Sequence, residues 1–303
     1  RLWLGLRPVI CPGLDPCISK FFSKPSMIHS IRFGFQKYHQ EFLLGIAYLL
    51  MYTPIFAWMW DRWWSRDSYY SHGILIPIIS AYLIWQKKEE LRAIPREPSR
   101  MGILWIALGV LAFLFSSFFR IYFIAGFTMI IVLSGLILSF WGKRILHKIL
   151  FPIFFLAFMT PLPEILITEI SFHMKIFAAQ VATTILNNFL HLSALREGSL
   201  IKMAHAYVMV DDVCSGLRSL MSLTALGSLF AYWLKGSGYK KILLFLSTIP
   251  IAVITNVFRI VLLSSISEIW GPRYAAGFLH SASGFIVFAL AFVLLWGVSK
   301  ILE

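Results

Sequence analysis

Charged residues are scarce in this chain. Only 14% of its 303 residues are charged, whereas 59% are hydrophobic and the mean hydropathy is +0.78. A soluble globular domain is nearer one quarter charged and one half apolar. The composition therefore excludes an ordinary soluble domain and predicts an all-α polytopic membrane protein.

Several other features are missing as well. No internal repeat, low-complexity tract or linker interrupts the apolar part, so we expect a single membrane-embedded domain at 42–303. Residues 1–41 lack the apolar core and cleavage site of a signal peptide and are interpreted as a basic N-terminal lead, with disorder as one interpretation. Cys11 and Cys17 could be half of a metal site, but no His or further Cys lies nearby. We therefore predict neither a metal nor a cofactor.

Apolar segments of nearly the length needed to span a bilayer recur along the chain. A spanning helix needs about 20 apolar residues, or fewer where neighbouring helices cover its ends. About eight transmembrane helices are predicted, at 42–60, 72–86, 102–119, 121–141, 145–160, 214–234, 241–265 and 281–300. The second and fifth segments are short and contain or border proline, which is typical of re-entrant or protein-covered segments.

The basic residues assign a side of the membrane to each loop. With the N-terminus in the cytoplasm, 18 of the 27 Lys and Arg residues lie inside and seven lie outside, as the positive-inside rule requires. The net charge of +13 is therefore better explained by membrane orientation than by binding to nucleic acid. We expect a multi-pass protein of the cell (inner) membrane.

One long loop, 161–213, then faces the extracytoplasmic side. Its first part, 167–192, carries Glu, Lys, His and Asn among apolar residues, which predicts an amphipathic helix on the outer leaflet. The following "REGSLIKMAHAYVMVDDV" is rich in β-branched residues and is broken at Gly198 and at Ala204–His205, which predicts a short β-hairpin leading into Cys214.

Three polar residues reach the outer boundary on three consecutive predicted spans. Cys214 begins the sixth span, Arg259 lies about six residues inside the outer end of the seventh, and His280 begins the eighth. A lone Cys or boundary His is usually structural. An Arg inside a span costs about 2.5 to 3.5 kcal/mol on insertion scales, so Arg259 is harder to explain without a function. Their common depth favours a site.

These three side chains suit acyl-transfer chemistry. A helix N-terminus or a protonated His280 favours the thiolate of Cys214, whereas Asp211 and Asp212 oppose it if they lie close. His280 could act as base and then as acid, and Arg259 could stabilise an oxyanion or only pair with a buried acid.

Two residues near the cysteine have open roles. Gly216 either lets substrate backbone approach or only loosens the start of the helix. Arg218, four residues after Cys214, is a candidate for substrate carboxylates or a partner of Asp211 or Asp212.

At these residues the chain resembles the exosortase/archaeosortase family of membrane cysteine transpeptidases. The matching pieces are "CSGLRSL" at 214–220, "NVFRI" at 256–260, His280 to Gly284, and "DSYYSHGILIPIISAYLIWQKKEE" at 67–90. The resemblance implies a catalytic domain of eight spans with Cys214, Arg259 and His280 as catalytic residues. We take five further residues in these pieces as substrate-binding or supporting: His72, Ser215, Gly216, Arg218 and Asn256.

The resemblance also implies the substrate. Family members recognise a C-terminal sorting signal, made of a short motif such as Pro-Glu-Pro, one transmembrane helix and a basic tail. They cleave near the motif and are expected to transfer the exported protein to a membrane lipid or lipid-linked acceptor. An acidic motif would suit Arg218, Arg196 or Lys202.

Two other function classes compete with this hypothesis. Intramembrane Arg and His also mark transporters and channels, but those concentrate polar groups near the midplane and often show inverted repeats. A non-catalytic assembly subunit of an exopolysaccharide export system would tolerate loss of Cys214. A metalloprotease is disfavoured because His-Glu-x-x-His does not occur.

Overall fold

The computed structural model describes residues 27–65, 68–211, 215–275 and 278–303, with side chains described from residue 39 and, in the last segment, from residue 282. It divides into two compact units, residues 1–53 and 54–303. The division falls within helix α2 (Met27–Trp64), at Pro54. Proline removes a backbone hydrogen bond from a helix and weakens its continuity there. The second unit contains every predicted site residue.

All eight segments predicted to span the membrane are helical. Beyond α2 they correspond to η1 (Ser71–Ile74) with α3 (Leu75–Gln86), α5 (Met101–Phe118), α6 (Tyr122–Phe140), the broken run α7 (Lys143–Lys148), α8 (Leu150–Phe155) and η2 (Leu156–Met159), then α10 (Leu217–Trp233), α11 (Gly238–Trp270) and α13 (Phe278–Leu302). Short helices α4 (Lys88–Ala93) and α12 (Pro272–Ala275) connect them.

Six helices in the described residues are long and apolar enough to cross a membrane: His39–Trp64, Met101–Phe118, Tyr122–Phe140, Glu164–Asn188, Gly238–Trp270 and Ala282–Leu302. The prediction of about eight is thus matched only in part. Segments 72–86, 145–160 and 214–234 are not in this set because their helices are short. Conversely, α9 (Glu164–Asn188), predicted to lie on the outer leaflet, meets the criteria of length and composition.

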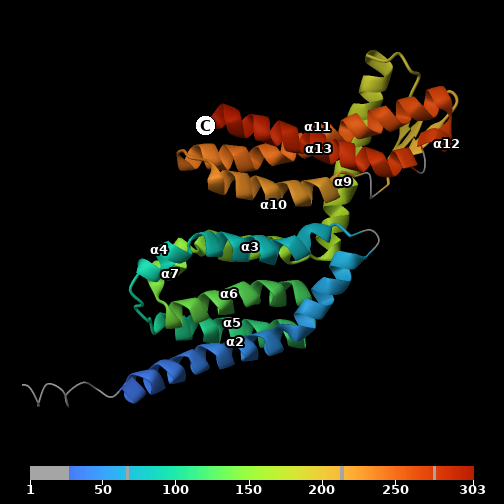
Figure 1. The fold of residues 1–303 in the computed structure, drawn as a ribbon. Coiled ribbons are helices and arrows are strands. Elements are labelled where there is room, and N and C mark those ends of the chain that lie inside the picture. The colour runs from blue at the N-terminus through green and yellow to red at the C-terminus, as the bar shows by residue number, and fades with distance from the viewer. Residues whose placement is uncertain (1–26, 66–67, 212–214, 276–277) are drawn as a thin grey trace, which may run out of the picture. The chain divides into compact units, whose positions relative to one another are not determined.

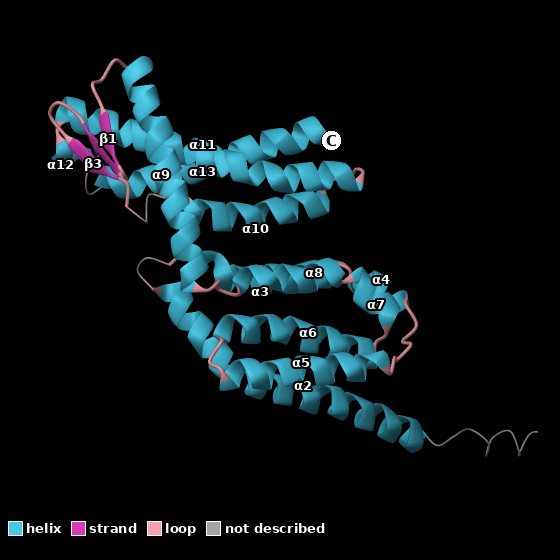
Figure 2. Cartoon of the chain, turned by 180° about the vertical axis from the view of Figure 1, so that it is seen from behind, coloured by secondary structure: helices cyan, strands magenta, loops and turns pink. Residues whose placement is uncertain are grey.

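The direction of α9 differs from that of the other long helices. In Figures 1 and 2, α9 runs across α10, α11 and α13, whereas those three run alongside one another. Within the second unit, the same views show α4, α7 and the C-terminus at one end of the long helices. They show α9, α12 and the strands at the other end. The segments assigned to opposite sides of the membrane therefore separate in space.

Small residues hold two of these helix pairs close together. A Cβ on Gly135 of α6 would lie 2.9 Å from the backbone nitrogen of Ile106, so α5 and α6 approach at backbone distance. Ala178, Ala179 and Ala182 form a buried stripe on α9 that packs, with Leu186, against Val257 and Ile260 of α11. Such small-residue contacts are the usual means of helix association inside membranes.

The extracytoplasmic prediction of a β-hairpin is extended by the structure to three antiparallel strands. They are β1 (Leu195–Glu197), β2 (Leu200–Lys202) and β3 (Tyr207–Met209), in the order β1-β2-β3. Gly198, at φ +64°, occupies the two-residue turn between β1 and β2, where a positive φ is required. Ile201 is fully buried in the cluster that joins the sheet to α9 and α11.

The carboxyl-terminal end of α11 carries this sheet. Both carboxylate oxygens of Glu268 accept a hydrogen bond from the backbone N–H of His205, at 3.0 and 3.1 Å. Since α11 has 33 residues, it reaches from the lysines at its start to the loop between β2 and β3. One helix thus connects the two ends of the bundle.

Candidate active site

The start of α10 is built on Gly216. This residue caps the helix with φ +85°, a backbone conformation that L side chains rarely adopt. A Cβ added there would lie 2.8 Å from Cγ of Asn256 on α11. Ser215 is buried, and its Oγ accepts a hydrogen bond from the N–H of Leu217 at 3.3 Å. Gly216 therefore provides space for Asn256, a role that neither sequence interpretation anticipated.

Arg259 lies one helical turn after Asn256 and points toward a different helix. Its side chain is buried, and its Nε donates a hydrogen bond to Oγ of Ser283 on α13 at 2.9 Å. Ser283 is itself buried and follows His280 by three residues in the sequence. This contact fixes the direction of the guanidinium plane.

The N-x-x-R spacing has a structural meaning. Residues three apart on a helix are neighbours on one face but differ by about 60° in direction. On α11 this places Asn256 against Gly216 of α10 and Arg259 against Ser283 of α13. Three sequence motifs far apart in the chain therefore meet around the second half of α11.

The side chains of the predicted nucleophile and base are not among those that the structure describes. Cys214 lies outside the described residues, and for His280 the structure describes the helix but not the side chain. Figures 1 and 2 show that α10 and α13 begin toward the same end of the bundle. The catalytic roles of Cys214, Arg259 and His280 remain predictions.

His72 connects the segment 67–90 to α10. Its Nδ1 lies 3.2 Å from Oγ of Ser222, which also donates to the carbonyl oxygen of Arg218 at 3.2 Å. His72 therefore contacts α10 one turn beyond Arg218, and its supporting role stays a prediction. The side chain of Arg218 is half-buried.

Tyr70 is a neighbouring contact that the sequence analysis missed. Its hydroxyl lies 4.0 Å from Sδ of Met221 and accepts a hydrogen bond from the N–H of Leu162 at 3.0 Å. Burial raises the pKa of Tyr70 to about 12, against the opposing effect of the Leu162 bond, so the phenol stays neutral. Ser222 and Ser283 were also missed, although both stand at helical spacing from predicted residues and could have been found that way.

The other cations proposed for an acidic substrate motif lie on the sheet. Lys202 Nζ is 2.6 Å from a carboxylate oxygen of Glu197, and Arg196 donates to the carbonyl oxygen of Gly198 at 3.0 Å. Asp211 is exposed, and Asp212 lies outside the described residues. Of the three cations, Arg218 is the one on the helix that carries the motif.

The described residues contain no group of three or more His, Cys, Asp or Glu side chains placed to hold a metal ion. Cys11 and Cys17 lie outside those residues.

Comparison with known families gives a direct result. The profile of the transmembrane exosortase family matches residues 63–297, which include all the motifs quoted above. No curated protein and no solved structure matches the chain.

Proposed function

Because the chain belongs to the transmembrane exosortase family of cysteine sorting transpeptidases, we propose that Cys214, His280 and Arg259 form its catalytic centre. The family acts on substrate proteins that carry a C-terminal sorting signal. The observation that carries the proposal is the pair of contacts described above, Gly216 with Asn256 and Arg259 with Ser283. They support a common site for three motifs that are separated in the sequence.

The reaction follows from the chemistry of these groups. The Cys214 thiolate attacks the carbonyl carbon of the scissile peptide bond, and the carbonyl oxygen becomes an oxyanion beside the Arg259 guanidinium. The C–N bond then breaks, and His280 gives its proton to the leaving amine. An acceptor nucleophile attacks the resulting thioester, loses its proton to His280, and releases the Cys214 thiolate.

The neighbours of the proposed catalytic residues hold them in place before the reaction begins. A guanidinium that stabilises a developing charge is most effective when it need not reorient during the reaction. The bond from Arg259 Nε to Ser283 holds the guanidinium in one direction. Asn256, packed under Gly216, holds the start of α10 close to the same helix.

We also propose the membrane topology of the sequence analysis. Eight segments span the membrane, α9 lies along the outer surface, and the end of the bundle with the sheet faces the extracytoplasmic side. The steep crossing of α9 over α10, α11 and α13 in Figures 1 and 2 supports a helix in the membrane plane. Exposed apolar residues such as Ile165 and Phe172 on the same helix suit immersion at the interface.

The substrate then reaches the centre from within the membrane. Its transmembrane helix packs among the spans, its basic tail remains in the cytoplasm, and its motif arrives at the outer boundary. Arg218 is the proposed contact for an acidic residue of the motif. The acceptor is a membrane lipid or lipid-linked group.

The test is processing of a co-expressed substrate that ends in a motif, an apolar helix and a basic tail. Cys214→Ala should abolish cleavage while the protein remains inserted, and Cys214→Ser should retain little activity because a hydroxyl ionises far less readily. The double variant Cys11→Ala and Cys17→Ala is the matched control and should process normally. Normal cleavage by Cys214→Ala would exclude covalent catalysis by this residue.

A further inference from the structure

A cavity of about 770 Å³ is lined by residues that the proposed mechanism does not use. It is bounded by the end of α2, the start of α6 and the start of α9. Its lining includes two arginines, one glutamate and several aromatic side chains: Arg62, Arg120, Glu164, Trp58, Tyr69 and Tyr122. In the described residues, neither Arg259 nor the motif at the start of α10 contributes to this lining.

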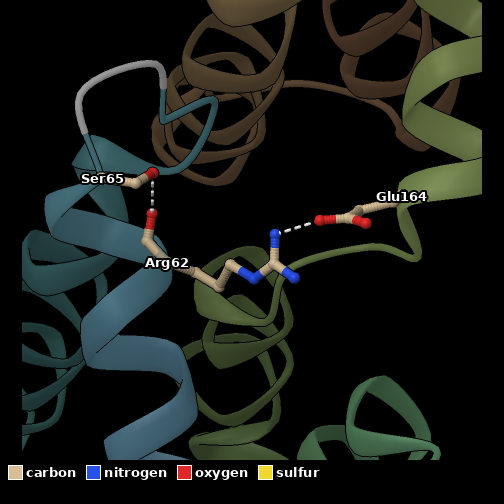
Figure 3. A network of polar contacts seen from close by, with 3 residues as sticks. All are labelled: Arg62, Ser65 and Glu164. Atoms are coloured by element: carbon tan, nitrogen blue, oxygen red, sulfur yellow. Dashed lines mark hydrogen bonds and ion pairs between the residues drawn. The ribbon is translucent and has the colours of Figure 1, made fainter.

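Among the described residues, the charged side chains that line the cavity are mostly basic. Figure 3 shows Arg62 directed toward Glu164, with which it forms an ion pair. Both side chains are largely exposed, at 45% and 71%, and exposed pairs hold their partners weakly, so another anion can exchange with this carboxylate. No carboxylate among the described residues pairs with Arg120. The two arginines therefore outnumber the single acid.

Arg120 adopts an unusual backbone conformation. Its φ of +55° places it in the left-handed region just after α5, where its N–H donates to the carbonyl of Ser117. Glycine is the usual residue at such a helix end, because a Cβ is disfavoured there. Keeping an arginine at this position has a conformational cost, which suggests that the guanidinium itself is needed.

The surroundings of the cavity are those of a lipid headgroup layer. Trp58, Tyr69 and Tyr122 line it, and Trp and Tyr gather where a membrane protein meets the interface. Close in sequence to the lining residues Arg120 and Glu164, Phe118 is 83% exposed and Ile165 is 73% exposed. A cationic cavity with apolar side chains at its border suits a ligand with an anionic head and apolar chains.

We propose that this cavity binds the phosphate headgroup of a membrane lipid. Arg120 and Arg62 bind the phosphate oxygens, since a guanidinium matches phosphate with paired hydrogen bonds. The acyl chains extend past Phe118 and Ile165. Tyr70 also lines the cavity and reaches Met221 on α10, so a bound lipid borders the helix that follows the proposed nucleophile.

The experiment measures lipid binding to the full-length protein in an uncharged detergent, and it does not depend on catalysis. Three probes are titrated: dioleoyl phosphatidylglycerol, soluble glycerol 3-phosphate and dioleoylglycerol. Arg120→Gln is compared with Arg273→Gln, which removes an exposed arginine of α12. Arg120→Gly also removes the cation but relieves the left-handed strain, so its thermal unfolding midpoint should equal or exceed that of the native chain.

Phosphatidylglycerol should bind the native protein and the Arg273 variant equally, and it should bind both Arg120 variants about tenfold more weakly. A decrease of this size is expected for the loss of one charge-assisted hydrogen bond. Glu164→Gln, which frees Arg62, should strengthen binding.

Glycerol 3-phosphate bound as tightly as the lipid would overturn a lipid site in favour of a free phosphate site. Equal binding of dioleoylglycerol, or equal loss in the Arg120 and Arg273 variants, would overturn headgroup recognition. Failure of Cys214→Ala to block processing would leave this inference intact.

Discussion

Adding one methyl group at Gly216 tests how the start of α10 is built. Gly216→Ala places a Cβ on a residue with φ +85°, which costs about 1–2 kcal/mol in the left-handed region. The same Cβ would lie 2.8 Å from Cγ and 2.9 Å from Cβ of Asn256, well inside ordinary contact distance. Overpacking of a buried site costs a further 1–3 kcal/mol, roughly. The free energy of unfolding should therefore fall by about 2–5 kcal/mol.

Gly198→Ala is the matched control. Gly198 has a similar backbone conformation, with φ +64°, but a Cβ there meets nothing within 4 Å. This variant should lose only the backbone contribution, about 1–2 kcal/mol. Adding Asn256→Ala to Gly216→Ala removes two of the three close atoms, Cγ and Nδ2, and should recover part of the difference.

The assay is denaturant titration in detergent, with substrate processing measured on the same preparations. Gly216→Ala should lose processing even where it remains folded, because the helix start must shift away from Asn256. Gly198→Ala should process normally. Equal destabilisation of the two variants, with no recovery in the double variant, would refute a close packing of Gly216 on Asn256.

Two further predictions address the arginine and the topology. Arg259→Ala should lower turnover by about 10²–10³ while substrate cross-linking and the unfolding midpoint change little, because an oxyanion contact operates in the transition state; loss of stability and binding together would instead indicate a structural ion pair. Arg259→Lys should rescue only in part, since an ammonium cannot reproduce the planar fork. Reporter fusions after residues 95 and 238 should be cytoplasmic, and fusions within 175–205 should be extracytoplasmic; an external reporter at 238 would overturn the span assignment.

The helices were predictable because runs of hydrophobic residues can be recognised directly in the sequence. All eight predicted segments are helical. Segment 145–160 is divided, because α7 ends at Lys148 and α8 begins at Leu150. Which helices cross the membrane was less predictable. In α9 the apolar residues are numerous enough for a span, and its orientation depends on how its alanine stripe packs on α11. Packing between two helices cannot be predicted from the composition of one of them.

The same limit applies to the site. Residues with distinctive chemistry, such as Arg259 and Asn256, were identified from motif and depth. The residue that anchors Arg259 is a serine, Ser283, and serines are common in these helices. Its role depends on which helix lies opposite, and that is a tertiary property. The third strand was missed because three residues, Tyr207–Met209, give too short a pattern to separate from the preceding hairpin.

The length of α11 has a consequence for substrate choice. At 1.5 Å per residue its 33 residues extend about 50 Å, whereas the hydrocarbon core is about 30 Å thick. In the proposed topology, the excess length of α11 holds the sheet, which Glu268 binds near the far end of the helix, above the apolar layer. A substrate anchored by its own membrane helix can present its cleavage site at that height only with a spacer of suitable length. The enzyme can therefore select among substrates by the length of this spacer as well as by the chemistry of the motif.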